Sequence, residues 1–221
     1  MKTELVIFDL DGTLVNTIAD LATATNYALA AGGYPTHHMS AYPFYVGNGV
    51  TKLIERALPS EARNEDEIER VRRFFKEYYD VHLTDASTPY PGIPELLAEL
   101  NARGIKMAVA SNKYQSAVER IITYFFPDIP WVAIEGQKPD VPVKPDPSIV
   151  FQVLLKSPTI KDAVLYTGDS GVDMETAYRA GVESVGVTWG FRPESELAEN
   201  YASNIINSPA QLLEIIDSKM S

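Results

Sequence analysis

Short apolar runs alternate with segments of helical spacing along most of the chain. The apolar runs are rich in β-branched residues and end in turn residues, whereas the segments between them repeat their apolar residues with the period of a helix. This alternation is typical of an α/β fold with a parallel, Rossmann-like sheet. The expected strands begin at Glu4, Ile105, Trp131, Ala163 and Ser184, with a possible sixth at Asn204, and the expected helices span residues 93–103, 115–124, 148–155 and 174–180.

Residues 16–88 interrupt this alternation. Three helical patterns follow one another there with no convincing strand between them, at 18–33, 50–59 and 65–83. The chain returns through a proline-rich stretch that begins at Thr88 and has the composition of a domain boundary. We therefore expect a helical cap domain over residues 16–88, inserted into a Rossmann-like core formed by residues 1–15 and 89–221.

The composition narrows the class of ligand. The 221 residues carry a formal net charge of -11 and include no cysteine. Nucleic acid and anionic membranes are poor partners for an acidic protein, because binding them requires a positive field. Any metal must be held by oxygen or imidazole. No apolar run is long enough to cross a bilayer, and the N-terminus enters a strand at once. These features predict a cytoplasmic protein that acts on a small molecule, and they leave open whether it is a monomer or a homodimer.

Four aspartates stand at the predicted ends of two strands. Asp9 and Asp11 follow the first strand, and Asp169 and Asp173 follow the fourth. Ligands of open parallel sheets bind outside the carboxyl ends of the strands, so these side chains are expected to converge. Carboxylates share a small volume at neutral pH only if a cation neutralises them or some are protonated. The sequence therefore predicts a Mg²⁺ site, because Mg²⁺ binds through carboxylates and completes its shell with waters and substrate phosphate.

Groups suited to phosphate lie on neighbouring segments. Ser111 and Asn112 stand at the end of the second strand, and Lys144 lies in a stiff, proline-containing segment. A phosphate binds a hydroxyl, backbone amides and a point charge, although Asn112 could instead shape the turn. Beside a cation, the Asp9 carboxylate is suited to attack phosphorus and form an aspartyl phosphate. Asp11, two residues on, could protonate the leaving oxygen and later deprotonate the attacking water.

Four motifs resemble, in order, those of the haloacid dehalogenase superfamily. They are DLDGT from Asp9, SN from Ser111, KPDP from Lys144 and GDSGVD from Gly168. The resemblance spans essentially the whole chain and includes a helical cap inserted after the first motif. It implies a Mg²⁺-dependent phosphatase with the fold expected above.

The resemblance also assigns roles. It implies that Asp9 is the nucleophile and a Mg²⁺ ligand, and that Asp11 is the acid/base and binds the metal through its main-chain carbonyl. Asp169 would complete the metal site, with Asp173 supporting it directly or through a water. The phosphoryl group would be held by Ser111, Asn112 and Lys144.

The substrate is less firmly indicated. YVGNGVTKLIERAL and GVTWGFRPESEL resemble the phosphoglycolate phosphatase group, which implies a small phosphorylated acid with Val46 to Gly49 closing over it. A β-phosphoglucomutase keeps both aspartates and is the main rival. A dehalogenase needs neither Mg²⁺ nor Asp11, and a phosphonatase has a small residue at that position, although Lys52 could stand for its Schiff-base lysine. A phospho-accepting signalling receiver is an alternative from another class of protein. Its phosphorylated aspartate lies at the end of the third strand, whereas Asp9 lies at the end of the first.

The remaining charged and aromatic residues have structural interpretations. Isolated surface cations are usually solvated, and an aromatic run with helical spacing usually forms core. We therefore expect most of these cations to be solvated: Lys52, Arg56, Lys113 and Arg192. We expect the aromatic run to form the core of the cap: Phe74, Phe75, Tyr78 and Tyr79.

Overall fold

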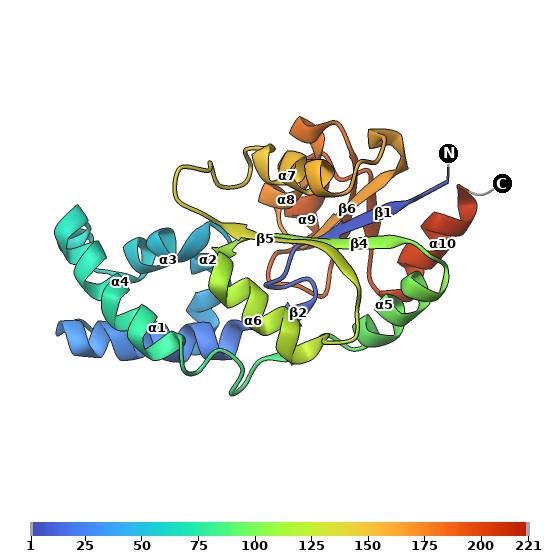
Figure 1. The fold of residues 1–221 in the computed structure, drawn as a ribbon. Coiled ribbons are helices and arrows are strands. Elements are labelled where there is room, and N and C mark those ends of the chain that lie inside the picture. The colour runs from blue at the N-terminus through green and yellow to red at the C-terminus, as the bar shows by residue number, and fades with distance from the viewer. Residues whose placement is uncertain (1, 220–221) are drawn as a thin grey trace.

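A computed structural model describes residues 2–219 and contains a six-stranded parallel sheet (Figure 1). The strand order is β5-β4-β1-β6-β7-β8, so the chain starts in the middle of the sheet and builds outward in both directions. The predicted fold class is confirmed, and the possible sixth strand is present as β8. The strands are β1 (Leu5–Phe8), β4 (Lys106–Tyr114), β5 (Trp131–Gln137), β6 (Val164–Gly168), β7 (Glu183–Val187) and β8 (Asn204–Ile206).

Helices cover both faces of the sheet, which is why β1 and the middle of its neighbour β4 are continuous apolar runs. Leu5 and Ile7 of β1 pack on one face with the buried residues of α7 and α8. Val6 and Phe8 pack on the other face with the buried residues of α5, α6 and α10. Figure 1 shows these helices on the side of the sheet away from α7 and α8. The predicted helices are found as α5 (Ile93–Ala102), α6 (Gln115–Phe125), α7 (Ser148–Lys156) and α8 (Gly171–Ala180), and α9 (Glu194–Glu199) and α10 (Ala210–Ser218) follow them.

The segment predicted to be helical lies beyond the carboxyl ends of the strands (Figure 1). Its two long helices pack against each other, with Tyr27 and Tyr78 stacked at 4.4 Å between ring centroids. The three predicted helical patterns are confirmed, whereas the four-residue α2 is too short to show a period. The helices are α1 (Ile18–Gly32), α2 (Tyr42–Tyr45), α3 (Gly49–Ala57) and α4 (Glu65–Tyr79), with 3-10 turns at Met39–Ala41 and Ser60–Ala62.

The chain crosses from the sheet to the helical segment at β2 (Val15–Asn16) and returns at β3 (Thr88–Pro89). These two crossings pair as an antiparallel ribbon. The backbone amide of Tyr90 extends it by donating to the Leu14 carbonyl at 3.1 Å. The buried carboxylate of Asp20 in α1 accepts from the hydroxyl of Ser87 at 2.6 Å and from its amide at 2.8 Å. The ribbon coincides with the predicted boundaries of the cap, and the division into two domains stays a prediction.

None of the helices within residues 2–219 combines the length and the apolar character that crossing a bilayer requires.

Candidate active site

The end of β1 places two carboxylates beside the sheet. The Asp9 amide donates to the Thr167 carbonyl at 2.9 Å, so the backbone of Asp9 is still held by β6. Its carboxylate accepts from the Leu10 amide at 2.7 Å. The chain then turns at Gly12, where φ is 86°, in the left-handed region that favours glycine. A Cβ there would lie 2.3 Å from a carboxylate oxygen of Asp169, so Gly12 leaves room for an acidic neighbour from another strand.

The end of β6 supplies the second acidic pair. Asp169 is held in place, because its carboxylate accepts from the Phe191 amide at 2.7 Å and Gly190 packs so closely that a Cβ there would lie 2.2 Å from the Asp169 Cβ. Asp173 lies in the first turn of α8 and forms a capping box with Ser170, whose hydroxyl donates to its carboxylate at 2.6 Å. This box explains why α8 begins at Gly171, three residues before the predicted start.

Three of the four aspartates form one cluster, and Asp11 lies outside it but lines the same pocket as Asp9 and Asp169. One carboxylate oxygen from each of Asp9, Asp169 and Asp173 lies within 4.8 Å of the others. All three side chains are buried. The structure therefore supplies a set of oxygen donors of the kind that a hard divalent cation binds. Their roles as metal ligands stay predictions.

Lys144 is fully buried between two of these carboxylates. Its Nζ lies 3.0 Å from Asp9 Oδ1 and 2.7 Å from Asp173 Oδ1, and it donates to the Ala110 carbonyl at 3.1 Å. The side chain of Asn112 fixes the loop that carries Lys144, because its Oδ1 accepts from the Lys144 amide at 2.8 Å and its Nδ2 donates to the Lys144 carbonyl at 3.2 Å. Asn112 thus shapes the chain, as one of its two interpretations expected, and its contact with substrate stays a prediction.

Asp11 is oriented by two side chains. Its Oδ1 accepts from the Thr17 hydroxyl at 2.6 Å, and Lys113 Nζ lies 3.0 and 3.1 Å from its two oxygens. The expectation that Lys113 is solvated is wrong, since only 7% of it is exposed. Side chains alternate along a strand, so Lys113 shares the face of Ser111 and points into the site. That spacing of two along β4 was the signal in the sequence that could have identified Lys113.

Arg192 is the second cation whose expected solvation is wrong. Its side chain is 15% exposed, and one Nη donates to the Val46 carbonyl at 3.0 Å. Asn112 donates to the next carbonyl, that of Gly47, at 3.1 Å. Arg192 and Asn112 thus bind successive carbonyls of the loop from Val46 to Gly49. This is the loop that was expected to close over the substrate. Lys52, in contrast, is exposed as expected.

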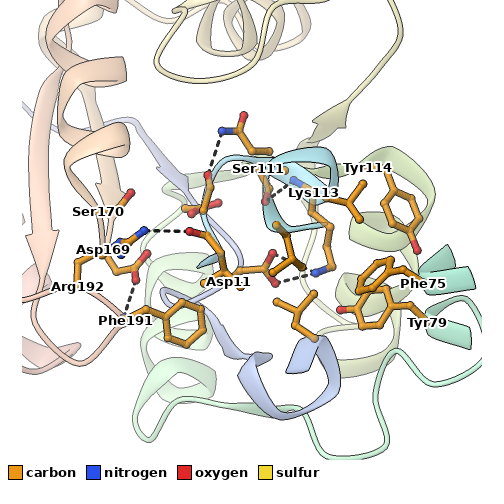
Figure 2. A pocket seen from close by; sticks show the side chains of 18 residues that line it. Asp11, Phe75, Tyr79, Ser111, Lys113, Tyr114, Asp169, Ser170, Phe191 and Arg192 are labelled. Carbon is orange, nitrogen blue, oxygen red and sulfur yellow. Dashed lines mark hydrogen bonds and ion pairs between the residues drawn. The ribbon is translucent and has the colours of Figure 1, made fainter. Parts of the chain in front are cut away.

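One pocket of about 50 Å³ is lined by Asp9, Asp11, Ser111, Asn112, Lys113, Asp169 and Arg192 (Figure 2). This volume has room for only a few water molecules. Its floor is polar and comes from the strand ends, with Ser111 beside the aspartates, whereas its walls are largely apolar. The residues from the helical segment that line it are Leu21, Val46, Gly47, Gly49, Val50, Leu53, Phe75 and Tyr79.

The four aspartates at the floor of the pocket carry more negative charge than Lys144 and Lys113 can balance. Burial raises the pKa of Asp9 to about 7, and Lys144 opposes this rise while Asp173 and Asp11 add to it. Burial, with Asp173 and Asp9 nearby, also raises the pKa of Asp169 well above its usual range. Burial alone would lower the pKa of Lys144, but Asp173 and Asp9 hold it well above its usual value, so the lysine stays charged. A divalent cation would relieve the remaining repulsion, so the donor set fits Mg²⁺.

This charge distribution predicts how stability depends on pH. Asp9 and Asp169 keep their protons to higher pH in the folded protein than in the unfolded chain, so their contribution to the free energy of unfolding should fall between about pH 5 and pH 8 in EDTA. Mg²⁺ should therefore raise the melting temperature more at about pH 8 than at about pH 5. Differential scanning fluorimetry with EDTA or Mg²⁺ measures this, and Asp169→Asn should abolish most of the difference. An equal Mg²⁺ effect at both pH values would contradict the assignment.

An open parallel sheet with a polar pocket at the ends of its strands is the architecture of an α/β enzyme. The family model for haloacid dehalogenase-like hydrolases matches residues 6–187, and the chain belongs to this family. The phosphoglycolate phosphatase of Pasteurella multocida is 31% identical over 97% of this chain and 98% of its own length. That of Haemophilus influenzae is 32% identical over 96% of this chain and 98% of its own.

Solved structures agree with this assignment. A protein from Lactobacillus delbrueckii subsp. bulgaricus superposes with a TM-score of 0.91 at 31% identity, covering 98% of this chain and 99% of its own. A predicted phosphoglycolate phosphatase from Haemophilus somnus gives a TM-score of 0.89 at 32% identity, covering 97% and 98%. The predicted family, fold class and enzyme class, a phosphoric monoester hydrolase, are confirmed. The substrate, the metal and the residue roles stay predictions.

Proposed function

We propose that this phosphatase hydrolyses a small phosphorylated acid, with phosphoglycolate as the leading candidate, through an aspartyl phosphate on Asp9 and with Mg²⁺ as cofactor. The observation that carries the proposal is one pocket lined by Asp9, Ser111 and Asp169, with Lys144 buried against Asp9. The names of the relatives support the substrate. The cluster of buried aspartates supports Mg²⁺ as the cofactor.

The metal would be held by the carboxylates of Asp9 and Asp169, with the main-chain carbonyl of Asp11 as the family resemblance implies. Asp173 supports the site from behind, because both of its oxygens are already bound, by Lys144 and by Ser170. When bound, Mg²⁺ would neutralise the charge that Asp9 and a phosphoryl group bring together.

The chain's own residues then account for the reaction. An Asp9 oxygen attacks phosphorus, the bond to the leaving oxygen breaks, and Asp11 donates a proton to that oxygen. In the second step Asp11 accepts a proton from water as the water oxygen attacks phosphorus, and the bond to Asp9 breaks. Thr17 and Lys113 fix the Asp11 carboxylate for both transfers. Ser111 and Lys144 hold the phosphoryl oxygens, and the helical segment excludes bulk water.

The pocket walls favour the phosphatase over its main rival. A sugar ring carries several hydroxyl groups that need hydrogen-bond partners, whereas the walls from the helical segment are largely apolar. We therefore place a small phosphorylated metabolite, and neither nucleic acid nor membrane, as the partner. The cytoplasmic location stays a prediction from the sequence.

Phosphate release from phosphoglycolate, glucose 1-phosphate and p-nitrophenyl phosphate tests the proposal. We expect phosphoglycolate to give the highest kcat/KM and EDTA to lower the rate at least about 100-fold, with recovery in excess Mg²⁺, because the metal neutralises charge in the transition state. Full activity in EDTA would reject the metal. Conversion of glucose 1-phosphate to glucose 6-phosphate without phosphate release would reject hydrolysis in favour of a mutase.

A further inference from the structure

Tyr79, the last residue of α4, has a buried hydroxyl group with no hydrogen-bond partner within residues 2–219. A buried polar group left unpaired is costly, so each one in a folded protein requires an explanation. Five side-chain atoms are in this state in the described chain, and of the five residues only Tyr79 lines the pocket described above.

The hydroxyl group of Tyr79 points toward the interior of the pocket (Figure 2). Its ring stacks on that of Phe75 with the centroids 5.0 Å apart, and Lys113 Nζ lies 4.9 Å from the centroid of the Tyr79 ring. Burial raises the pKa of Tyr79 well above its usual value, and the negative charges of Asp11 and Asp20 add to this rise. The hydroxyl group therefore keeps its proton and acts as a donor.

The surroundings indicate what this donor binds. The groups proposed to bind the phosphoryl end come from the strand ends and from the loop of Lys144, whereas Tyr79 belongs to the helical segment, which also lines the pocket with the apolar residues Leu21, Leu53 and Phe75. Water is disfavoured in such a setting, since a bound water needs two to four polar partners. In the proposed substrate the acceptors outside the phosphoryl group are carboxylate oxygens, so a donor on this side of the pocket would pair with one of them.

We infer that the Tyr79 hydroxyl group binds a carboxylate oxygen in the part of the substrate that is not the phosphoryl group, and so selects phosphorylated acids over alkyl phosphates. This inference rests on the proposed function and adds a specificity residue to it. A site built around a buried donor rejects an analogue that lacks the acceptor, because the donor is then left unpaired.

The test compares phosphoglycolate with ethyl phosphate, which has a methyl group in place of the carboxylate, in the wild type and in Tyr79→Phe. For Tyr79→Phe we expect kcat/KM for phosphoglycolate to fall about 10- to 100-fold, the range for losing a hydrogen bond to a charged group. For ethyl phosphate it should change less than about threefold, since no acceptor is lost. The melting temperature should stay equal or rise, because the variant removes an unpaired polar atom.

Tyr114→Phe is the matched control. Its hydroxyl group also belongs to a pocket residue, but it donates to Asp80 Oδ1 at 2.6 Å. Removing it should lower the melting temperature, because the Asp80 carboxylate loses a partner, and should leave the ratio of kcat/KM values for the two substrates unchanged.

The outcomes separate this inference from the proposed function. If the wild type prefers phosphoglycolate and Tyr79→Phe keeps that preference, the role of Tyr79 is wrong and the proposed function stands. An equal loss on both substrates would also overturn the inference, because Tyr79 would then act through Asp11 and not on the carboxylate. If the wild type does not prefer phosphoglycolate at all, the proposed substrate fails and the inference fails with it.

Discussion

Asp9→Asn should lower kcat by at least about 1000-fold, because removing a nucleophile from a two-step mechanism removes the covalent route itself. The amide keeps the shape of the side chain, and its oxygen can still accept from the Leu10 amide. The folded structure should therefore persist. In EDTA the variant should be as stable as the wild type or more so, since one of several mutually repelling carboxylates is gone.

Three measurements check this result. Phosphate release gives kcat, circular dichroism gives the melting temperature, and mass spectrometry of the acid-quenched enzyme detects a phosphoryl adduct in the wild type but not in the variant. The exposed Asp128, changed to asparagine, controls for the loss of a negative charge. If Asp9→Asn keeps more than about a tenth of the wild-type kcat, the covalent mechanism is wrong.

Lys144→Met should destabilise the fold by about 3 to 5 kcal/mol, the cost of leaving a buried charge without its partner. The change keeps most of the side-chain volume but removes the charge that faces Asp9 and Asp173. The loss should be larger at about pH 8 than at about pH 5, because the carboxylates can take up protons at the lower pH. Urea unfolding in EDTA at the two pH values measures it.

Two further variants test the cause of this loss. Lys52→Met removes an exposed lysine whose partner is Glu55 and should change the free energy of unfolding by less than about 1 kcal/mol. The double variant Lys144→Met with Asp173→Asn should regain part of the stability, since it also removes one of the stranded charges. A loss below about 1 kcal/mol in Lys144→Met would show that the buried ion pairs do not support the fold.

The sequence was sufficient to predict the sheet and the acidic floor of the site. Strands such as Leu5–Phe8 are buried on both faces and therefore read as continuous apolar runs. Their ends are then known to within a residue or two, and the topology of a parallel sheet brings Asp9 and Asp169 to one edge. The local apolar pattern and the topology of the sheet both place these aspartates at the same edge, so their position could be predicted without knowing how side chains pack.

The roof of the site could not be predicted in the same way. Arg192 and Tyr79 are buried where the helices of residues 18–79 meet the strand ends, and that packing leaves no periodic pattern in the sequence. Lys113 differs from them, because its spacing of two from Ser111 along β4 was a usable signal. As an isolated surface residue, a lysine or an arginine is normally solvated. A tyrosine in an aromatic helical run is normally core, and Tyr79 is indeed core by its ring while its hydroxyl group faces the pocket.

The ribbon of β2 and β3 limits how this enzyme can admit a substrate. The two segments that connect the sheet with the helical segment are hydrogen-bonded to each other as β2 and β3. Asp20 of α1 also binds Ser87, next to β3. Neither segment can therefore slide along the other without breaking several hydrogen bonds at once. Any movement of the helical segment away from the strand ends would therefore shift both crossings together. The helical segment would then return to the same position over the strand ends in every turnover. The Tyr79 hydroxyl group would regain the same position relative to the aspartates.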